Sequence, residues 1–141
     1  MVEFTVFGNP VAQKRHRHHK FGTYDPSKKD KEQFYLQAVK HKPKEPLSGN
    51  VFADVVFYMP RPKSHYRTGK YKDRLKFSAP HYYHSVKPDV DNLVKFLFDS
   101  ISGKDKFIKD DCNVGCLKAQ KVYIGRNDKP RTEVKLFALQ K

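Results

Sequence analysis

The densest apolar run of the chain, Asn50–Met59, sets the first constraint on the fold. It is rich in β-branched residues and is bounded by Gly49 and Pro60, which predicts a strand. Because apolar residues follow one another here, we expect this strand to be buried on both faces at the centre of a β-sheet.

Two other regions predict further strands. Val2–Phe7 alternates in polarity and ends at the turn residues Gly8-Asn9-Pro10, which predicts an opening strand. Residues 114–124 and 132–139 are strand-like runs joined by the turn-rich residues 125–130, which predicts a closing β-hairpin.

Two segments have helical character. The clearer one follows Pro88 and runs to Ser102-Gly103, with apolar residues at helical spacing at Leu93, Phe96, Leu97 and Ile101. The other is expected to begin with the cap Asp25 and the first-turn residue Pro26 and to continue through about Lys42. Its apolar stripe would consist of Phe34, Leu36, Ala38 and Val39.

The charge balance points to a polyanionic partner. Lys and Arg number 29 against 15 Asp and Glu, which gives a formal net charge of +14. Cations that meet phosphates release condensed counterions, so we expect binding to nucleic acid rather than to an anionic membrane. A basic protein that is merely soluble is the alternative.

The sequence also predicts where the protein works. No run approaches the ~18 apolar residues needed to cross a bilayer, and residues 1–7 lack a signal-peptide pattern. We therefore expect a cytoplasmic protein in which Cys112 and Cys116 are reduced. Both cysteines are expected to point inward from a strand as small apolar side chains.

Two basic segments without apolar periodicity are expected to contact DNA. Residues 14–20 should lie in a loop, and residues 60–88 form a connection far longer than the usual ~4–6 residues. In the longer segment, cations interleave with aromatic residues, which suits phosphate contact and base stacking, although a flexible solvated insertion is the alternative. The expected nucleic-acid contacts are Lys14, Arg15, Arg17, Lys20, Arg61, Lys63, Arg67, Lys70, Lys87 and Asn92.

An acidic pair is conspicuous in so basic a chain, because carboxylates repel the phosphates that the remaining surface attracts. Asp89 and Asp91 flank Val90, and in an extended segment this spacing places both side chains on one side. Such a pair suits Mg²⁺, which prefers oxygen ligands and leaves positions open to water and phosphate. The alternative is that either aspartate caps the following helix.

Two further features favour the metal site. Lys95 follows Asp91 by one helical turn, so it could reach a phosphate, or else form an ion pair with Asp91. Asp110 and Asp111 follow the helix, and because successive strand residues point to opposite faces, only one of them is expected to join the first pair.

The order and spacing of these residues resemble the signature of the RusA family of Holliday junction resolvases. The matching segments are Lys87-Pro88-Asp89-Val90-Asp91-Asn92-Leu93-x-Lys95, Phe98-Asp99 and Asp110-Asp111-x-x-Val114. Tyr24-Asp25-Pro26-Ser27, the opening strand and the final hairpin are similar too, so the resemblance spans nearly the whole chain. Residues 61–86 are its least typical part.

The resemblance implies one α+β domain over residues 1–141, with a mixed β-sheet packed against two helices. It implies a homodimer, in a bacterial or phage-infected cell, that cuts paired strands of four-way DNA junctions with Mg²⁺, for which Mn²⁺ can substitute. The catalytic residues would be Asp89, Asp91, Lys95 and Asp111, with Asp89, Asp91 and Asp111 as metal ligands.

Three rival functions remain. A non-catalytic DNA- or RNA-binding protein would explain the charge but not the clustered acids, and a nuclease acting on flaps or forks would use the same site on another branched DNA. A zinc protein is disfavoured, because the spacing of Cys112 and Cys116 fits no recognised zinc pattern.

Overall fold

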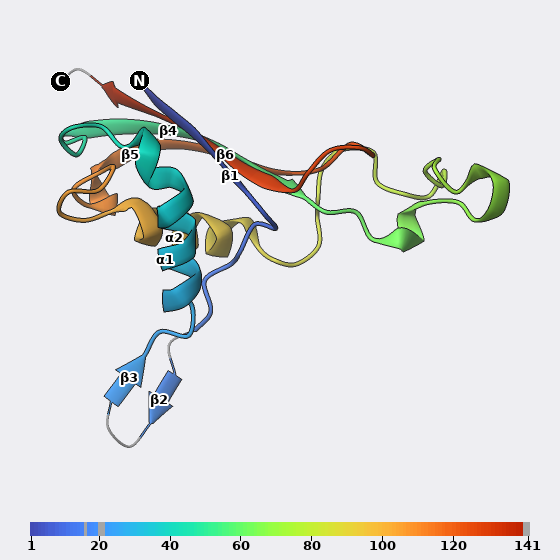
Figure 1. Cartoon of the computed structure of the whole chain (residues 1–141), viewed down its shortest axis with the longest axis horizontal. Helices are drawn as coiled ribbons and strands as arrows, with labels where there is room; N and C mark the ends of the chain where they lie inside the picture. Colours follow the sequence, from blue (N-terminus) through green and yellow to red (C-terminus); the bar gives the residue numbers. More distant parts are fainter. Residues whose placement is uncertain (16, 20–21, 140–141) are drawn as a thin grey trace.

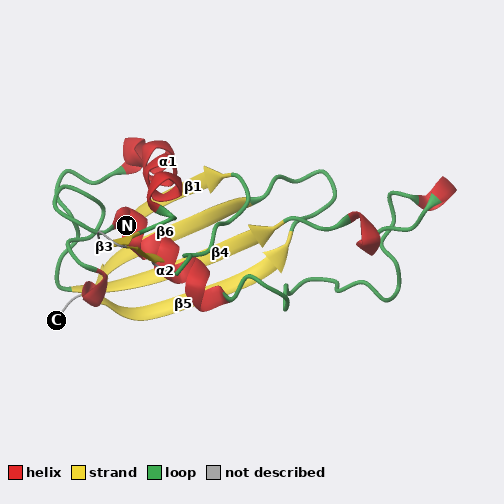
Figure 2. Ribbon diagram, turned by 90° about the horizontal axis from the view of Figure 1, so that it is seen from below, coloured by secondary structure: helices red, strands yellow, loops and turns green. Residues whose placement is uncertain are grey.

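The computed structural model describes residues 1–15, 17–19 and 22–139, and its centre is a four-stranded sheet in the order β1-β6-β4-β5. The strands are β1 (Val2–Phe7), β4 (Asn50–Met59), β5 (Val114–Tyr123) and β6 (Arg131–Leu139). β4 pairs parallel with β5 and antiparallel with β6, so the sheet is mixed. Figure 2 shows α1 (Lys28–Ala38) and α2 (Val90–Ile101) on one face of this sheet, which confirms the α+β class.

β4 is a central strand, as its apolar run predicts, but only one of its faces is fully buried. Its buried side chains are Val51, Ala53, Val55, Phe57 and Met59, and the residues between them are half-buried. The prediction of burial on both faces is wrong because α1 and α2 cover a single face of the sheet (Figure 2).

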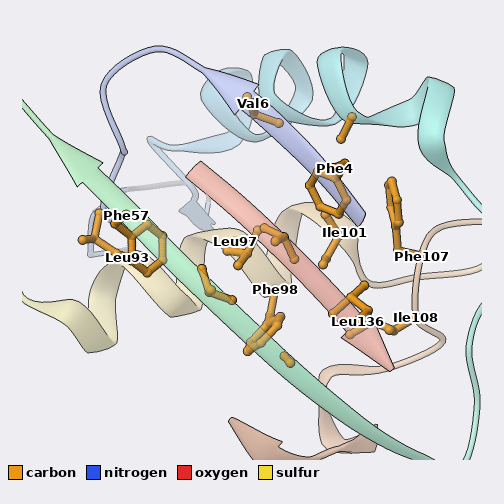
Figure 3. Packing of buried hydrophobic residues seen from close by; sticks show 14 of the residues in the cluster. Phe4, Val6, Phe57, Leu93, Leu97, Phe98, Ile101, Phe107, Ile108 and Leu136 are labelled. Atoms are coloured by element: carbon orange, nitrogen blue, oxygen red, sulfur yellow. The ribbon is translucent and has the colours of Figure 1, made fainter. Parts of the chain in front are cut away.

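α2 confirms the predicted second helix. Leu93, Leu97 and Ile101 point into the core, and Figure 3 shows Ile101 in the same cluster as Phe4 of β1 and Phe107. The rings of Phe4 and Phe107 lie 4.6 Å apart. This packing fixes which face of α2 meets the sheet, and the other face is left for polar residues.

α1 begins later and ends earlier than the sequence predicts. Ser27, not Asp25, is its N-cap residue, because Asp25 Oδ1 accepts the backbone N–H of Ser27 at 2.9 Å and holds this turn outside the helix. After Ala38 the chain tightens into the 3-10 helix η1 (Val39–His41).

Within residues 1–15, 17–19 and 22–139, no helix has the length and hydropathy needed to span a membrane.

The predicted apolar stripe of α1 is only partly correct. Phe34 packs edge-on against Phe96 with the ring centres 5.9 Å apart, and Ala38 is buried. Leu36 is 65 % exposed and Val39 is exposed, because positions two or five residues after Phe34 turn away from its face.

The predicted closing hairpin is wrong, because β4 lies between β5 and β6. The N–H of Ile124 donates to the carbonyl of Met59 at 3.0 Å, so the chain that leaves β5 crosses the end of β4 before β6 begins. β5 is therefore an edge strand, and much of it is exposed.

Cys112, just before β5, and Cys116, in β5, are both exposed, so the prediction that they point inward is also wrong.

Part of the basic segment 14–20 is a strand instead of a loop. β2 (Arg17–His19) pairs antiparallel with β3 (Gly22–Tyr24), and Figure 1 shows this small hairpin beyond the end of α1, away from the main sheet. The loop prediction is wrong for these three residues, since backbone pairing requires no apolar periodicity. His16 and Lys20 lie outside the described residues.

Residues 60–88, here called the arm, extend well beyond the end of β4 (Figure 1). Two backbone hydrogen bonds join its outgoing and returning halves: Arg67 N–H to the Arg74 carbonyl at 2.8 Å, and Lys76 N–H to the His65 carbonyl at 2.9 Å. These contacts favour a folded arm over the alternative of a flexible insertion.

The returning half of the arm pairs with the free edge of β5. The N–H of His84 donates to the Lys121 carbonyl at 3.0 Å, and the N–H of Tyr123 donates to the Tyr82 carbonyl at 2.8 Å. The arm thus covers the C-terminal part of this edge and enters α2 directly afterwards.

Candidate active site

Asp89 occupies the N-cap position of α2 with a free carboxylate. Its backbone carbonyl accepts the N–H of Leu93 at 3.2 Å, but its exposed side chain makes no capping hydrogen bond. An aspartate at this position normally accepts a first-turn N–H, so capping does not account for the side chain of Asp89.

Lys121 of β5 fixes the turn that leads into Asp89. Its ammonium donates to the carbonyl oxygens of Val86 at 2.7 Å and Pro88 at 2.6 Å, on either side of Lys87. Two short charge-assisted hydrogen bonds therefore tie the backbone before Asp89 to the sheet. Sequence reasoning missed Lys121, because nothing in an edge strand signals which distant carbonyls its lysine will bind.

Asp91 lies inside the first turn of α2, which corrects the expectation that Asp89 and Asp91 share an extended segment. Its Oδ1 accepts the N–H of Asn92 at 3.0 Å, and its side chain is exposed. Both aspartates lie at the N-terminal end of α2, where the helix dipole stabilises negative charge.

Lys95 and Asp99 continue the row that Asp91 begins, at spacings of one and two turns along α2. Lys95 is exposed, and across the part of the chain that the structure describes its ammonium forms no ion pair with Asp91 or any other acid. Its charge is therefore available to a ligand.

Asp110 and Asp111 have different environments. Asp110 caps the 3-10 helix η4 (Asp111–Asn113): its Oδ1 accepts the N–H of Cys112 at 3.0 Å, and its own N–H donates to Asn113 Oδ1 at 3.2 Å. The Cys112 N–H and a hydrogen bond with Asp111 lower the pKa of Asp110.

The carboxylate of Asp111 is crowded by other acids. Its hydrogen bond with Asp110, its partial burial and the negative charges of Asp110 and Asp99 raise the pKa of Asp111. A carboxylate under such repulsion gains from a nearby cation. Asp110 is therefore occupied in capping η4, and Asp111 is the more crowded carboxylate; that one of the two binds a metal stays a prediction.

A salt-bridge network ties Asp99 to the N-terminal part of the chain. The Lys31 ammonium lies 2.6 Å from Asp25 Oδ2 and 3.3 Å from Asp99 Oδ2, which joins α1 to α2. Burial opposes ionisation of Asp25, but the Lys31 ammonium and the donors from Gln13 and the backbone lower the pKa of Asp25 to about 2. The backbone N–H of Gln13 donates to the Asn92 carbonyl at 3.0 Å, so the residues just before the basic segment lie against the start of α2.

The three expected metal ligands are not gathered around one point. Among the described residues, no group of three or more His, Cys, Asp or Glu side chains is placed to hold a metal ion. Asp89 and Asp91 lie at one end of α2, whereas Asp111 feels the charge of Asp99, which lies about 12 Å of helix rise beyond Asp91.

The donor chemistry nevertheless fits Mg²⁺. Asp89, Asp91 and Asp111 are exposed carboxylates, so each can rotate toward a cation without displacing a core residue. Hard oxygen donors are the ligands that Mg²⁺ prefers. That these three meet at one ion stays a prediction.

Most of the predicted DNA contacts are exposed. This group consists of Lys14, Arg15, Lys63, Lys70, Lys87 and Asn92. Arg17 begins β2, and Lys20 lies outside the described residues. Arg67 is half-buried, with its guanidinium 4.8 Å from the centre of the Phe77 ring.

Arg61 differs from the other predicted contacts because its guanidinium is used inside the protein. It donates to the carbonyls of Pro80 at 2.7 Å and His81 at 3.0 Å, and it lies 4.6 Å from the centre of the Tyr123 ring. The structure therefore assigns Arg61 to anchoring the arm.

Comparisons with known proteins identify the family of this chain. Residues 8–137 match the family described as Endodeoxyribonuclease RusA. The chain is also 37 % identical, over 141 residues, to the uncharacterized protein YqaN of Bacillus subtilis (strain 168), with 94 % of this chain and 93 % of that protein covered. Because the family match runs from the end of β1 into β6, and so includes the arm, α2 and η4, this chain belongs to the endodeoxyribonuclease RusA family.

Proposed function

We propose that this protein is a Mg²⁺-dependent endonuclease that resolves four-way DNA junctions by paired strand cuts. The observation that carries the proposal is the carboxylate of Asp89, which makes no capping hydrogen bond at the start of the helix that also carries the exposed ammonium of Lys95. In a chain of net charge +14, an exposed acid without a structural role would only weaken DNA binding, so a role in the reaction accounts for its presence better.

The roles of the residues follow from their chemistry. Asp89, Asp91 and Asp111 would hold Mg²⁺, which when bound polarises the scissile phosphate and lowers the pKa of water. Lys95 would neutralise negative charge that builds up on the phosphate in the transition state. Lys121 keeps Asp89 in position through the carbonyls that precede it.

DNA binding would come from cations on two extensions of the fold. One consists of Lys14, Arg15 and the β2–β3 hairpin that follows them, and the other is the arm. Both extend from the main body in Figure 1, on different sides of it, so they could contact separate arms of a branched DNA.

We further propose that the active form is a homodimer. A four-way junction has approximate two-fold symmetry, which a C₂ dimer matches with two equivalent active sites, one for each cut strand. Sedimentation of the protein alone and with junction DNA tests this assembly, and a monomer that makes paired cuts would rule it out.

One experiment tests both the reaction and the substrate. Purified protein is incubated with a synthetic four-way junction, a fork, a flap and a linear duplex at matched salt, with Mg²⁺ or with a chelator. We expect paired cuts in the junction in Mg²⁺ only, and an Asp89→Asn variant should bind the junction without cutting it.

The other outcomes identify the rival functions. Junction binding without cutting in Mg²⁺ supports a non-catalytic DNA-binding protein, and faster cutting of forks or flaps changes the substrate. Full cutting by Asp89→Asn removes the role proposed for this residue.

A further inference from the structure

A cavity of about 420 Å³ lies where the arm meets the turn between β5 and β6. Its lining includes Tyr58 of β4, Tyr66 and Tyr82 of the arm, and Arg126 of the turn. A second cavity of about 320 Å³ adjoins it, because both include Tyr66 and Arg126, and the second adds Lys72. Together they form one groove with Tyr66 and Arg126 in its shared wall. The side with Tyr58 and Tyr82 is here called its aromatic end, and the side with Lys72 its cationic end.

Tyr123 holds the aromatic end of this groove in place. Its ring lies 4.6 Å from the Arg61 guanidinium, and the rings of His65 and His84 lie 5.0 Å and 4.9 Å from it. Its backbone N–H donates to the carbonyl of Tyr82. The backbone of Tyr82 is therefore fixed, while the residue remains 53 % exposed.

Arginines offset the acidic residues of the groove. Asp73 of the arm pairs with Arg126 at 2.7 Å, and Asp128 pairs with Arg131 at 2.9 Å. The Arg131 guanidinium also lies 3.8 Å from the centre of the Tyr58 ring, on which it stacks. With its acids paired, the groove can accept a phosphate at its cationic end.

We propose that this groove binds one unpaired nucleotide of the DNA, with the base against Tyr66 and Tyr82 and its phosphate at Lys72, beside the Arg126–Asp73 ion pair. The inference rests on the proposed function, which makes branched DNA the substrate. Aromatic side chains stack on any base, and cations beside them bind the backbone. A base inside a duplex is stacked on both faces and must leave the helix to enter, so the groove would favour DNA that contains an unpaired base.

A bulged duplex tests this inference without any cutting. The probe is a duplex with one unpaired 5-iododeoxyuridine, compared with a continuous duplex in the presence of a chelator. We expect tighter binding of the bulged duplex and, under ultraviolet light, a cross-link to the peptide that carries Tyr66 or Tyr82.

Matched variants separate the groove from general aromatic surface. Tyr82→Ala should lose the cross-link and weaken binding to the bulged duplex roughly tenfold, with binding to the continuous duplex unchanged. Phe77→Ala is the control, because Phe77 is 91 % exposed on the same arm and lines neither cavity. Tyr82→Phe keeps the ring and should bind like the wild type, which separates lost stacking from misfolding.

Equal binding of the two duplexes by the wild type, or equal losses in Tyr82→Ala and Phe77→Ala, would overturn the inference. Junction cutting in Mg²⁺, measured in parallel, tests the proposed function separately. Cutting without a preference for the bulge removes the groove alone, and a preference for the bulge without cutting removes the nuclease alone.

Discussion

Two regions of the molecule use their charged groups in opposite ways. One is the polar face of α2, and the other is the contact of Arg61, His65 and His84 with Tyr123, here called the anchor of the arm. Along α2, the Asp89 carboxylate caps nothing, and Lys95 pairs with no acid in the described residues. At the anchor, Arg61 donates to two carbonyls and stacks on Tyr123. A charge without a fixed partner can bind a substrate or metal, whereas a charge with several partners maintains a shape.

Asp110 and Asp111 differ in the same way, because Asp110 caps η4 while Asp111 has no capping role, and this pair gives the prediction with the largest effect. Asp111→Asn removes a crowded carboxylate proposed to bind Mg²⁺, so we expect junction cutting to fall roughly 100- to 1000-fold while junction binding persists. Asp110→Asn should cut nearly as well as the wild type, because asparagine also caps helices well. Both are measured as single-turnover cutting rates in Mg²⁺.

A reversed order of these two variants would exchange the roles assigned to Asp110 and Asp111. Equal losses in both would mean that the pair acts as one unit, and the contrast between a capping acid and a metal ligand would not hold.

The second prediction concerns Lys121, which holds the turn before Asp89 against the sheet and is expected to position that candidate residue. Lys121→Met removes both hydrogen bonds to the turn before Asp89, and because small displacements of a catalytic group are costly, we expect cutting to fall roughly 10- to 100-fold. Lys118→Met is the matched control, since Lys118 is exposed on the same strand and its loss changes the net charge equally.

Binding measured in chelator separates the two possible effects of Lys121→Met. Lys121→Met should keep junction affinity, because its ammonium is already bound to two carbonyls, and Lys118→Met should lose at most the small contribution of one exposed cation. If Lys118→Met cuts as slowly as Lys121→Met, charge alone explains the result and the positioning role is wrong.

The third prediction weakens the anchor of the arm. Arg61→Ala leaves the Pro80 and His81 carbonyls without their donor and removes the contact with Tyr123. We therefore expect the free energy needed to open the arm to fall by about 1.5–3 kcal/mol. Chymotrypsin should then cleave the arm at least about tenfold faster than in the wild type. Lys63→Ala, at an exposed position of the arm, should leave the cleavage rate unchanged, and equal rates in all three proteins would show that Arg61 is not the anchor.

Local patterns in the sequence predict where helices and strands form better than they predict which strands pair with each other. The spacing of Leu93, Leu97 and Ile101 predicts α2 because burial of one helix face needs only local information. The turn residues 125–130 favour a hairpin, yet β4 pairs with both β5 and β6, and this choice depends on contacts between residues far apart in the chain.

The candidate active site shows the same limit. Asp89, Asp91, Lys95 and Asp111 can be proposed as its residues from the order and spacing of a family motif. The contacts that position them cannot, because the bonds from Lys121 to the Pro88 carbonyl and from Lys31 to Asp99 join residues 33 and 68 positions apart. The bond from Lys121 to a backbone carbonyl leaves no requirement on the identity of its partner, and the Lys31–Asp99 salt bridge joins two helices at no fixed spacing in the chain, so no sequence pattern records either contact.

The smallest expected effect is a pH dependence of the anchor. Burial, the Lys121 charge and the nearby His65 lower the pKa of His84, and burial with the charges of Arg61 and Lys76 lowers the pKa of His65. The unfolded chain therefore binds more protons than the folded protein once the pH falls below the ordinary histidine pKa of 6.5. Stability that is complete above this pH should be lost progressively as the pH falls toward the lowered values.

Thermal unfolding at pH 7.5 and pH 5.5 measures this effect. The melting temperature of the wild type should be lower at pH 5.5, and His84→Phe should reduce the difference, because a phenyl ring can pack on Tyr123 without binding a proton. His41→Phe, at an exposed position of η1, should keep the wild-type difference. If His84→Phe keeps it as well, acid sensitivity arises elsewhere, and the anchor would depend on Arg61 and backbone pairing instead of on a neutral histidine.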